Sequence, residues 1–513
     1  MTTLLSGASA TLVRDALTVL QPGFTGTTAP DWLLRQIGEG LSAVGLFGRN
    51  IVTPEQLTAL TARLRAERDD VLVAIDEEGG DVTRLEVRGG SSFPGNYALG
   101  CVDDTALTRD VARELGRRLA ACGVDLNWAP SADVNSNPDN PVIGVRSFGA
   151  DPQLTARHTV AYVEGMQAAG VAVCTKHFPG HGDTNVDSHH ALPRIDVDLD
   201  TLHARELVPF RAAIAAGSKA VMSAHILLPA LDPNRPATLS PQILTGLLRE
   251  ELGYQGLIVT DGMEMQAISS TYGIERGSVL ALAAGADAIC VGGGLADEGT
   301  VLRLRDAIVA AVRDGDLPEE RLADAAARVR ALADWTRRAR GAAAEPGAAS
   351  QEGTAPGSGI GLVAARRAVR LTPGERPFEP VTSPVYVAAL APVANIAVGD
   401  ETPWGVAAEL AALLPGTTTG SYAAGTGTAA VVADVLRAGG DRRIVAVVRD
   451  VHRHPWMAEA LDALVAARPD TIVVEMGVDR AEPRGALHIA TRGAARVCGR
   501  AAAEVVTGGG DGV

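Results

Sequence analysis

Short apolar runs alternate with longer amphipathic stretches through the first two-thirds of the chain. In the longer stretches, such as 54–70 (PEQLTALTARLRAERDD) and 105–123 (TALTRDVARELGRRLAACG), apolar residues recur at helical spacing. The short runs have the length of buried strands, and they lie at 17–21, 43–47, 71–76, 124–128, 172–177, 219–225, 256–261 and 287–291. This alternation predicts an α/β fold of the (β/α)8 TIM-barrel type, with a doubly wound open sheet as the alternative.

Polar or charged residues stand at the ends of many of these runs. Asp76, Asn127, His177, His225 and Asp261 each close an apolar run. In a parallel barrel, the site is built from the loops that follow the carboxyl ends of the strands. The pattern therefore favours the barrel over the open sheet and predicts chemistry at these strand ends.

A change in composition divides the chain. Residues 337–360 are rich in Gly, Ala, Ser and Pro and show no periodicity, which is typical of a flexible linker. We therefore predict a catalytic barrel over 1–336 and a smaller three-layer α/β domain over 361–513, to which no motif attaches a role. In the second domain we expect strands at 385–391, 444–449 and 471–476 and helices at 403–414, 427–438 and 456–467.

Charge and hydropathy exclude two classes of partner. The formal net charge is −15 and the chain has no long basic run, so a nucleic-acid partner is disfavoured. No uninterrupted apolar stretch of about twenty residues is present, so we expect no membrane partner.

The N-terminal stretch lacks the basic start of a secretory signal, and the five cysteines form no CxxC pair. These features predict a cytoplasmic protein.

The segment 176–193 (KHFPGHGDTNVDSHHALP) holds four of the ten histidines. Lys176 and His177, at a strand end, suit the binding of hydroxyl oxygens. His189 lies two residues after Asp187, and a carboxylate–imidazole pair is a common device for general acid/base catalysis. A metal site and a purely structural polar loop are the alternatives. The metal ligands would be His177, His181, His189 and His190, but HxH or HExxH spacing is missing, so we expect no metal.

Asp261 ends the apolar strand of the segment 256–265 (GLIVTDGMEM). A buried carboxylate at a strand end is costly unless it is paired or functional. The alternative is that Asp261 caps the following helix. Glu264 is the weaker candidate, since it falls in the helical turn after the strand.

The segment 75–85 (IDEEGGDVTRL) combines Asp76, a Gly-Gly turn and Arg84. A phosphate-binding loop is disfavoured, because neither GxGxxG nor GK[ST] is present and the flanking acidic residues repel phosphate. An acceptor Asp with a donor Arg fits a clamp on sugar hydroxyls better, and Arg146 is a further candidate donor.

Taken in order, these segments resemble glycoside hydrolase family 3, specifically its β-N-acetylglucosaminidase branch. The resemblance runs through most of residues 15–335, and the KHFPGHG…DSH element is highly specific. The resembling segments are 45–51 (GLFGRNI), 75–85, 127–149 (NWAPSADV…GVRSFG), 176–193, 222–226 (MSAHI) and 252–265 (LGYQGLIVTDGMEM).

The resemblance implies a retaining exo-enzyme that removes terminal, non-reducing β-linked GlcNAc and uses no cofactor. It implies Asp261 as the nucleophile, His189 as the general acid/base and Asp187 as the residue that orients His189. It also implies sugar binding by a further set of residues: Asp76, Arg84, Arg146, Lys176 and His177. The partner expected is a GlcNAc glycoside, such as a cell-wall or chitin fragment.

Three alternatives remain open at this point. A neutral imidazole tolerates an anionic acceptor, so a β-N-acetylglucosaminide or β-glucoside phosphorylase is the closest mechanistic rival. A non-catalytic sugar-binding barrel is disfavoured, because binding alone needs neither Asp261 nor the Asp-Ser-His element. A metal-dependent barrel hydrolase is the third.

Overall fold

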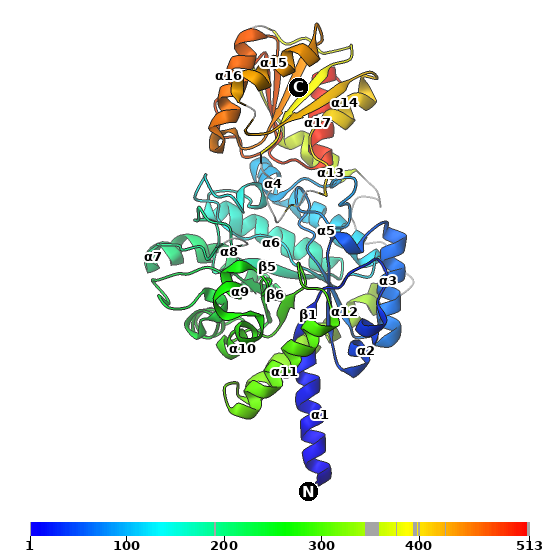
Figure 1. The fold of residues 1–513 in the computed structure, drawn as a ribbon, viewed down its shortest axis with the longest axis vertical. Helices are drawn as coiled ribbons and strands as arrows, with labels where there is room; N and C mark the ends of the chain where they lie inside the picture. The colour runs from blue at the N-terminus through cyan, green and yellow to red at the C-terminus, as the bar shows by residue number, and fades with distance from the viewer. Residues whose placement is uncertain are drawn as a thin grey trace. The chain divides into compact units, whose positions relative to one another are not determined.

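The protein consists of two compact units, each built from more than one stretch of the chain. The computed structural model describes residues 2–188, 191–343, 359–375, 377–392, 398, 401–425 and 427–509. The first unit comprises Met1–Glu78, Thr108–Ile143 and Ala150–Thr354. The second comprises Gly79–Leu107, Gly144–Gly149 and Ala355–Val513. Figure 1 shows the helices and strands of both units along the chain.

The first unit is a TIM-type barrel of parallel strands. Strands β2 to β7 form one sheet in sequence order, and β1 pairs with β8. A parallel bridge between Val259 and Ala288 connects the β7 strand with the residues that lead into β8. The predicted barrel is thereby confirmed. Its strands are β1 (Leu20–Pro22), β2 (Ala43–Leu46), β3 (Leu72–Ile75), β4 (Leu126–Asn127), β5 (Ala172–Phe178), β6 (Ala220–Ser223), β7 (Leu257–Thr260) and β8 (Ile289–Val291).

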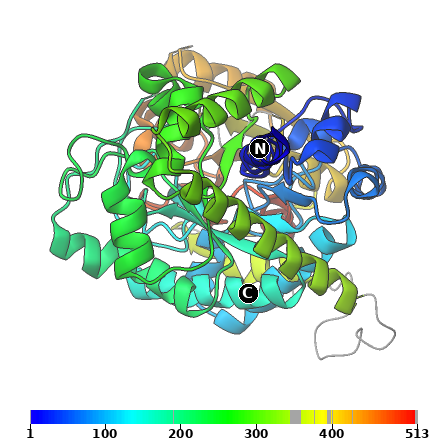
Figure 2. The same ribbon diagram turned by 90° about the horizontal axis from the view of Figure 1, so that it is seen from below.

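Helices follow the strands and surround them (Figure 2). Local signals set several helix starts: the Thr53 side chain caps α3, with Pro54 in the first turn, and the Asp151 side chain caps α6, with Pro152 in the first turn. The helices are α1 (Thr2–Thr18), α2 (Asp31–Glu39), η1 (Gly48–Asn50), α3 (Pro54–Glu67), α5 (Thr105–Ala121), α6 (Pro152–Ala168), α7 (Leu199–Thr201), η3 (Leu202–Glu206), α8 (Leu207–Ala215), η4 (Ala237–Leu239), η5 (Gln242–Glu251), α9 (Gln266–Tyr272), α10 (Ile274–Ala284), α11 (Glu298–Asp314) and α12 (Glu319–Ala343).

One predicted strand begins later than expected. The run 17–21 was predicted as a strand, but α1 continues through Thr18 and β1 covers Leu20–Pro22. Leu12, Ala16 and Leu17 are buried on α1, so helical burial takes the apolar residues at the start of this run.

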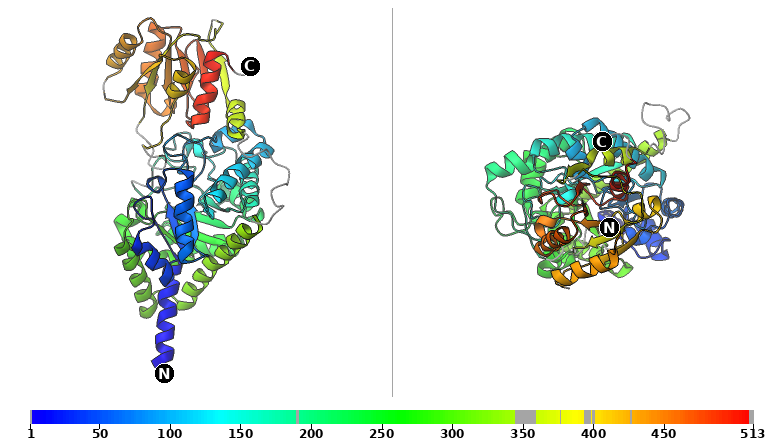
Figure 3. Two further views of the ribbon diagram at one scale, coloured as in Figure 1. Left: turned by 90° about the vertical axis from the view of Figure 1, so that its right-hand side faces the viewer. Right: turned by 90° about the horizontal axis from the view of Figure 1, so that it is seen from above.

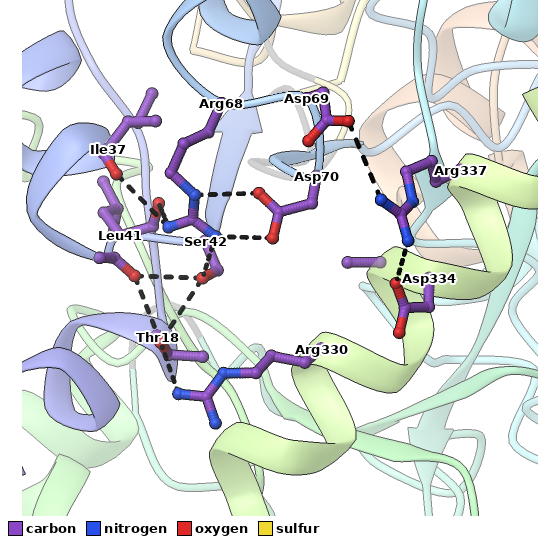
Figure 4. A network of polar contacts seen from close by, with 12 residues as sticks. Thr18, Ile37, Leu41, Ser42, Arg68, Asp69, Asp70, Arg330, Asp334 and Arg337 are labelled. Atoms are coloured by element: carbon purple, nitrogen blue, oxygen red, sulfur yellow. Dashed lines mark hydrogen bonds and ion pairs between the residues drawn. The ribbon is translucent and has the colours of Figure 1, made fainter. Parts of the chain in front are cut away.

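A polar network lies where several barrel strands begin (Figure 4). Ser42 directly precedes β2, Thr18 lies just before β1, and Asp70 lies two residues before β3. Arg68 donates to both carboxylate oxygens of Asp70, at 2.9 and 2.8 Å, and reaches Ser42 Oγ at 3.4 Å. Arg330 of α12 contacts Thr18 Oγ1 at 3.5 Å. This network ties α12 to the amino ends of the strands, the side of a barrel that serves stability rather than chemistry.

The second unit contains one six-stranded sheet. The sheet order is β11-β10-β12-β13-β14-β9, and only the pairing of β9 with β14 is antiparallel. The five parallel strands have the 2-1-3-4-5 order of a flavodoxin-like sheet. The strands are β9 (Arg370–Pro373), β10 (Tyr386–Leu390), β11 (Thr418–Tyr422), β12 (Ile444–Val448), β13 (Ile472–Glu475) and β14 (Leu487–Ala490).

Helices cover both faces of this sheet, which confirms the predicted three-layer α/β domain (Figure 3). On one face, α14 and α17 pack residues such as Leu410 and Ala502 against the strands. On the other, α15 and α16 pack residues such as Val435 and Leu461. The helices are α4 (Asn96–Val102), η2 (Gly144–Arg146), α13 (Ile360–Ala368), α14 (Ala407–Leu413), α15 (Thr428–Gly439), η6 (Val451–Arg453), α16 (Pro455–Ala467) and α17 (Arg496–Thr507).

The organisation differs from the sequence-based division in two respects. Helix α12 runs to Ala343, so the first seven residues of the predicted 337–360 linker are helical, and residues 344–358 lie outside the described part of the chain. The second unit also includes residues 79–107 and 144–149. Sequence periodicity gave no sign of this, because both segments lie between barrel strands.

Candidate active site

Three charged residues meet where β3 and β5 end. Asp76 directly follows β3, and Lys176 lies near the end of β5, two residues before Phe178. Lys176 Nζ is 2.5 Å from Asp76 Oδ1 and 2.7 Å from Glu78 Oε1. The Lys176 and Glu78 side chains are each 3% exposed and that of Asp76 is 19% exposed, so Asp76 is the member that solvent reaches. Asp76 and Lys176 were predicted for this site, and Glu78 was missed.

Asp261 lies at the same end of the barrel, because it directly follows β7 as Asp76 follows β3. Burial raises the pKa of the Cys174 thiol; Lys176 lowers this pKa, whereas Asp261 and Asp76 raise it further. Asp261, Asp76 and Lys176 lie far apart in the sequence, and all three are at the carboxyl ends of the barrel strands.

His177 is held by Asp133, a residue that sequence analysis did not single out. Asp133 Oδ2 accepts from His177 Nδ1 at 2.7 Å and from Ser131 Oγ at 2.8 Å. Asp133 Oδ1 accepts from the backbone N–H groups of His177 at 3.2 Å and His181 at 2.7 Å. Because its acceptor is a carboxylate, Nδ1 of His177 carries a proton. Asp133 thus sets both the tautomer and the orientation of the ring.

The charge on Asp133 persists despite full burial. Burial raises its pKa, but His177 and then His181 lower it, and the net result is a pKa well below the ordinary value. His181 shows the opposite balance: burial and the neighbouring His177 lower its pKa to about 4. His181 is therefore neutral near pH 7, and an imidazolium at this position would be costly.

We expect Asp133→Asn to lower kcat/KM by about 100-fold, because an amide cannot accept all four hydrogen bonds or favour the Nδ1–H tautomer of His177. Steady-state kinetics with the β-GlcNAc glycoside that the sequence resemblance implies, together with the melting temperature, check this result. When His177→Ala is added to the Asp133→Asn variant, kcat/KM should fall little further. Unchanged kcat/KM in a folded Asp133→Asn protein would contradict the role.

The backbone next to Asp261 is fixed by a buried histidine. Asp261 directly follows β7, its N–H donates to the Ser223 carbonyl at 3.2 Å, and its Oδ1 accepts from the Gly262 N–H at 2.8 Å. His225 Nε2 lies 3.0 Å from the Gly262 carbonyl, and His225 Nδ1 lies 2.9 Å from Thr238 Oγ1. His225 was recognised as a strand-end residue, but its contact with the segment that carries Asp261 was not foreseen.

Glu264 anchors the chain after β8. Its Oε1 accepts from the backbone N–H groups of Gly292 at 2.9 Å and Gly294 at 3.3 Å, and also from that of Gly293. A carboxylate oxygen engaged by three N–H groups has a structural task. This agrees with the lower rank that the sequence gave Glu264.

The proposed acid/base element is described only in part. His189 and His190 lie outside the described residues, so the acid/base role of His189 stays a prediction. Asp187 is partly buried, and its carbonyl accepts from the Ala191 N–H at 3.1 Å. Its orienting role toward His189 stays a prediction as well.

The loop that leads to these residues rests on η3. Arg205 donates to Asp183 Oδ2 at 2.7 Å and to Glu206 Oε1 at 2.6 Å. A Cβ atom at Gly180, where φ is +131°, would lie 2.8 Å from Glu206 Oε2, so the buried Glu206 packs directly against the loop. Burial raises the pKa of Glu206 to about 7, although Arg205 lowers it, while Asp133 and Asp183 raise it.

This raised pKa predicts a pH-dependent stability. Glu206 ionises near pH 4.5 in the unfolded chain and near pH 7 in the folded protein. The contribution of buried, protonated Glu206 to the free energy of unfolding is therefore complete below pH 4.5, falls as the pH rises to about 7, and is constant above that pH. Glu206→Gln does not titrate, so we expect its melting temperature, relative to wild type, to rise by about 3–6 °C between pH 5 and pH 7.5.

Calorimetric scans at the two pH values measure this difference. Glu475 of the second unit, whose pKa burial also raises to about 7, is present in both proteins and cancels. A difference that does not change with pH would show that Glu206 is ionised throughout.

Arg84 and Arg146 belong to the second unit, unlike Asp76, Lys176, His177 and Asp261. Arg84 is partly exposed, whereas Arg146 is buried at the end of η2. Their predicted contact with a sugar is therefore a proposal.

In the described parts of the chain, which do not include His189 and His190, no group of three or more His, Cys, Asp and Glu side chains is arranged to hold a metal ion. Within the same residues, no helix is long and apolar enough to cross a bilayer.

Comparison with known proteins places the first unit in a family. The family model described as the glycosyl hydrolase family 3 N terminal domain matches residues 27–332. The chain is 37% identical to beta-hexosaminidase A of Pseudoalteromonas piscicida over 332 residues, which cover 60% of this chain and 55% of that protein. It is 38% identical to a beta-hexosaminidase of Stenotrophomonas maltophilia (strain R551-3) over 268 residues, which cover 51% of this chain and 78% of the relative.

A solved structure resembles the chain over nearly its whole length. It is that of a glycoside hydrolase family 3 beta-N-acetylglucosaminidase from Paenibacillus sp. str. FPU-7, with a TM-score of 0.83 and 35% sequence identity. The match covers 97% of this chain and 96% of that one. The likeness thus includes the second unit as well as the barrel, and it confirms the resemblance inferred from the sequence.

Proposed function

The chain belongs to glycosyl hydrolase family 3, and on that premise we propose that it is a retaining exo-β-N-acetylglucosaminidase. Its substrates are GlcNAc glycosides, such as cell-wall or chitin fragments, from which it removes the terminal non-reducing sugar. The observation that carries the proposal is Asp261, a carboxylate at the end of a barrel strand, at the same end of the barrel as the Asp76–Lys176 pair. The names of the two relatives and of the solved structure support the choice of sugar.

The proposed reaction proceeds in two displacements. Asp261 attacks the anomeric carbon while His189, as imidazolium, protonates the departing glycosidic oxygen. His189 then takes a proton from water, which attacks the glycosyl–aspartate ester and releases GlcNAc with retained configuration. Retaining glycosidases commonly use two carboxyl groups about 5–5.5 Å apart, and here an imidazole oriented by Asp187 replaces one of them.

The remaining site residues bind and orient the sugar in this proposal. Asp76 accepts hydrogen bonds from hydroxyl groups, and Lys176 donates while its position is fixed by Glu78. His177 presents the ring nitrogen that Asp133 does not hold. Arg84 and Arg146 act as further donors to the substrate.

Hydrolysis of p-nitrophenyl β-GlcNAc, with and without inorganic phosphate, tests the proposal. We expect free GlcNAc as the product in both reactions. Formation of GlcNAc 1-phosphate would instead identify a phosphorylase, and binding without turnover would identify a sugar-binding barrel. Activity lost on exhaustive chelation and restored by a metal would identify a metal-dependent hydrolase.

We propose a cytoplasmic location on the basis of the cysteines. All five are free thiols, and four of them are buried. Unpaired cysteines of this kind are typical of a reducing compartment.

A further inference from the structure

We propose that the C-terminal part of the chain, residues 359–509, positions the loop after β3 and, through it, Arg84. The inference rests on the proposed function, because it takes Arg84 to bind the sugar. It gives the second unit a task in substrate binding that none of its own motifs indicated. The feature that carries the inference is Asp81, which lies three residues before Arg84. Residues 449 and 494 hold the Asp81 carboxylate.

Both oxygens of the Asp81 carboxylate are engaged by the C-terminal part. Oδ2 accepts from Arg449, which follows β12, in an ion pair, and Oδ1 accepts from the Ala494 N–H at 2.7 Å. The Asp81 side chain is 2% exposed and that of Arg449 is 14% exposed. Removing one partner of a buried ion pair lowers stability far more than removing one partner of a surface pair, because the remaining charge stays buried without compensation. The start of the loop is therefore held at one defined point.

The loop needs such an anchor because its first residues are glycines. Gly79 and Gly80 have φ values of +76° and +65°, and a Cβ at Gly80 would lie 2.4 Å from the Gly95 Cα. Glycine leaves the backbone more conformations in the absence of tertiary contacts. The geometry of a turn that precedes Arg84 is thus set by contacts beyond the turn itself.

The same part of the chain holds the loop at further points. The Val497 N–H donates to the Ser91 carbonyl at 3.3 Å, and Arg496 Nε donates to the Gly90 carbonyl at 3.3 Å. Tyr97 of α4 donates its hydroxyl to Asp479 Oδ1 at 2.6 Å. The loop is therefore fixed on both sides of Arg84.

These contacts extend to the second arginine. Asn96 Nδ2 donates to the Arg146 carbonyl at 2.8 Å. A Cβ at Gly100 would lie 1.9 Å from the Phe148 carbonyl oxygen, so α4 packs tightly against the segment that carries Arg146. Displacement of the 79–107 segment would consequently disturb Arg146 as well as Arg84.

The test replaces Arg449 and follows binding separately from chemistry. We expect Arg449→Met to raise KM for p-nitrophenyl β-GlcNAc about tenfold or more and to change kcat much less, because binding groups are displaced while Asp261 is not. Arg449→Lys, which keeps the charge, should recover part of the loss. Arg366→Met is the matched control: it removes a paired contact with Glu504 at 2.8 Å that lies wholly within residues 359–509, so KM should stay at the wild-type value.

A double-variant cycle shows whether Arg449 acts through Arg84. In the Arg84→Met background, Arg449→Met should raise KM by less than about threefold more. An unchanged KM for Arg449→Met, equal effects of Arg366→Met, or fully multiplicative effects of the two substitutions would each overturn the inference. If Arg449→Met does not fold, Asp81→Asn, which keeps an acceptor for Ala494, is judged by the same criteria.

Failure of the proposed function gives a different result. If the wild-type protein binds GlcNAc in calorimetric titration but does not turn over the substrate, the enzymatic proposal fails. The inference is then decided by whether Arg449→Met weakens GlcNAc binding about tenfold and Arg366→Met does not.

Discussion

Replacing Asp261 by alanine is expected to lower kcat for p-nitrophenyl β-GlcNAc by about 10⁴-fold or more, because the covalent glycosyl intermediate cannot form without the nucleophile. The loss should be the same for good and poor leaving groups, since no amount of leaving-group activation replaces the attacking carboxylate. Asp261 Oδ1 accepts from the N–H of the neighbouring Gly262 at 2.8 Å, and loss of this local contact should cost the fold little. Steady-state kinetics and melting temperature measure both effects.

Asp261→Asn is the matched variant. It keeps the shape of the side chain and an acceptor for the Gly262 N–H, but it removes the nucleophilic charge. It should be as inactive as the alanine variant and at least as stable. A folded Asp261→Asn protein that turns over within about tenfold of wild type would remove Asp261 from the nucleophile's role.

His189→Ala is expected to show a strong dependence on the leaving group. With a poor leaving group, loss of the general acid should lower kcat by about 10²–10⁴-fold. A dinitrophenolate departs without protonation, so the first step should survive and the glycosyl-enzyme should accumulate. Azide needs no base, so it should restore turnover and yield a β-glycosyl azide. Burst kinetics, mass spectrometry and product analysis detect the three results.

Asp187→Ala should give a weaker form of the same behaviour, because the imidazole remains but loses its orienting carboxylate. If good and poor leaving groups suffer equally in His189→Ala and no azide adduct forms, His189 only binds substrate. The acid/base role would then fall to another residue, with His181 or Glu264 as the first candidates, although the low pKa of His181 and the three backbone N–H groups on Glu264 Oε1 count against them.

The sequence predicted the barrel because its signal is local. Each buried strand is a short apolar run between amphipathic helices, and a polar residue follows where the strand leaves the core. Asp76, Lys176 and Asp261 were recognised on this basis. In the second unit, β10, β12 and β13 are buried apolar runs and were predicted too. Strand β11 is a largely exposed edge strand of sequence TTGSY, and β9 is also exposed, so neither produces an apolar run.

The partners of the site residues were not predictable in the same way. Asp133 contacts His177 from 44 positions away, and Glu78 contacts Lys176 from still further along the chain. Such pairs depend on which strands become neighbours, and a periodic pattern carries no information about them. The assignment of residues 79–107 to the second unit was missed for the same reason, because Asp81 and Arg449 are 368 positions apart.

The polar network at the amino ends of the strands has a consequence for protein engineering. Arg68, Asp70 and Arg330 secure the barrel at one end, whereas the candidate chemistry lies at the other. Random substitutions at the carboxyl ends of the strands therefore leave this stabilising network intact. A library that varies exposed loop positions at that end should keep more folded protein than one that includes Arg68, whereas Met263, next to Asp261 but fully buried, is a core position where random substitution is costly.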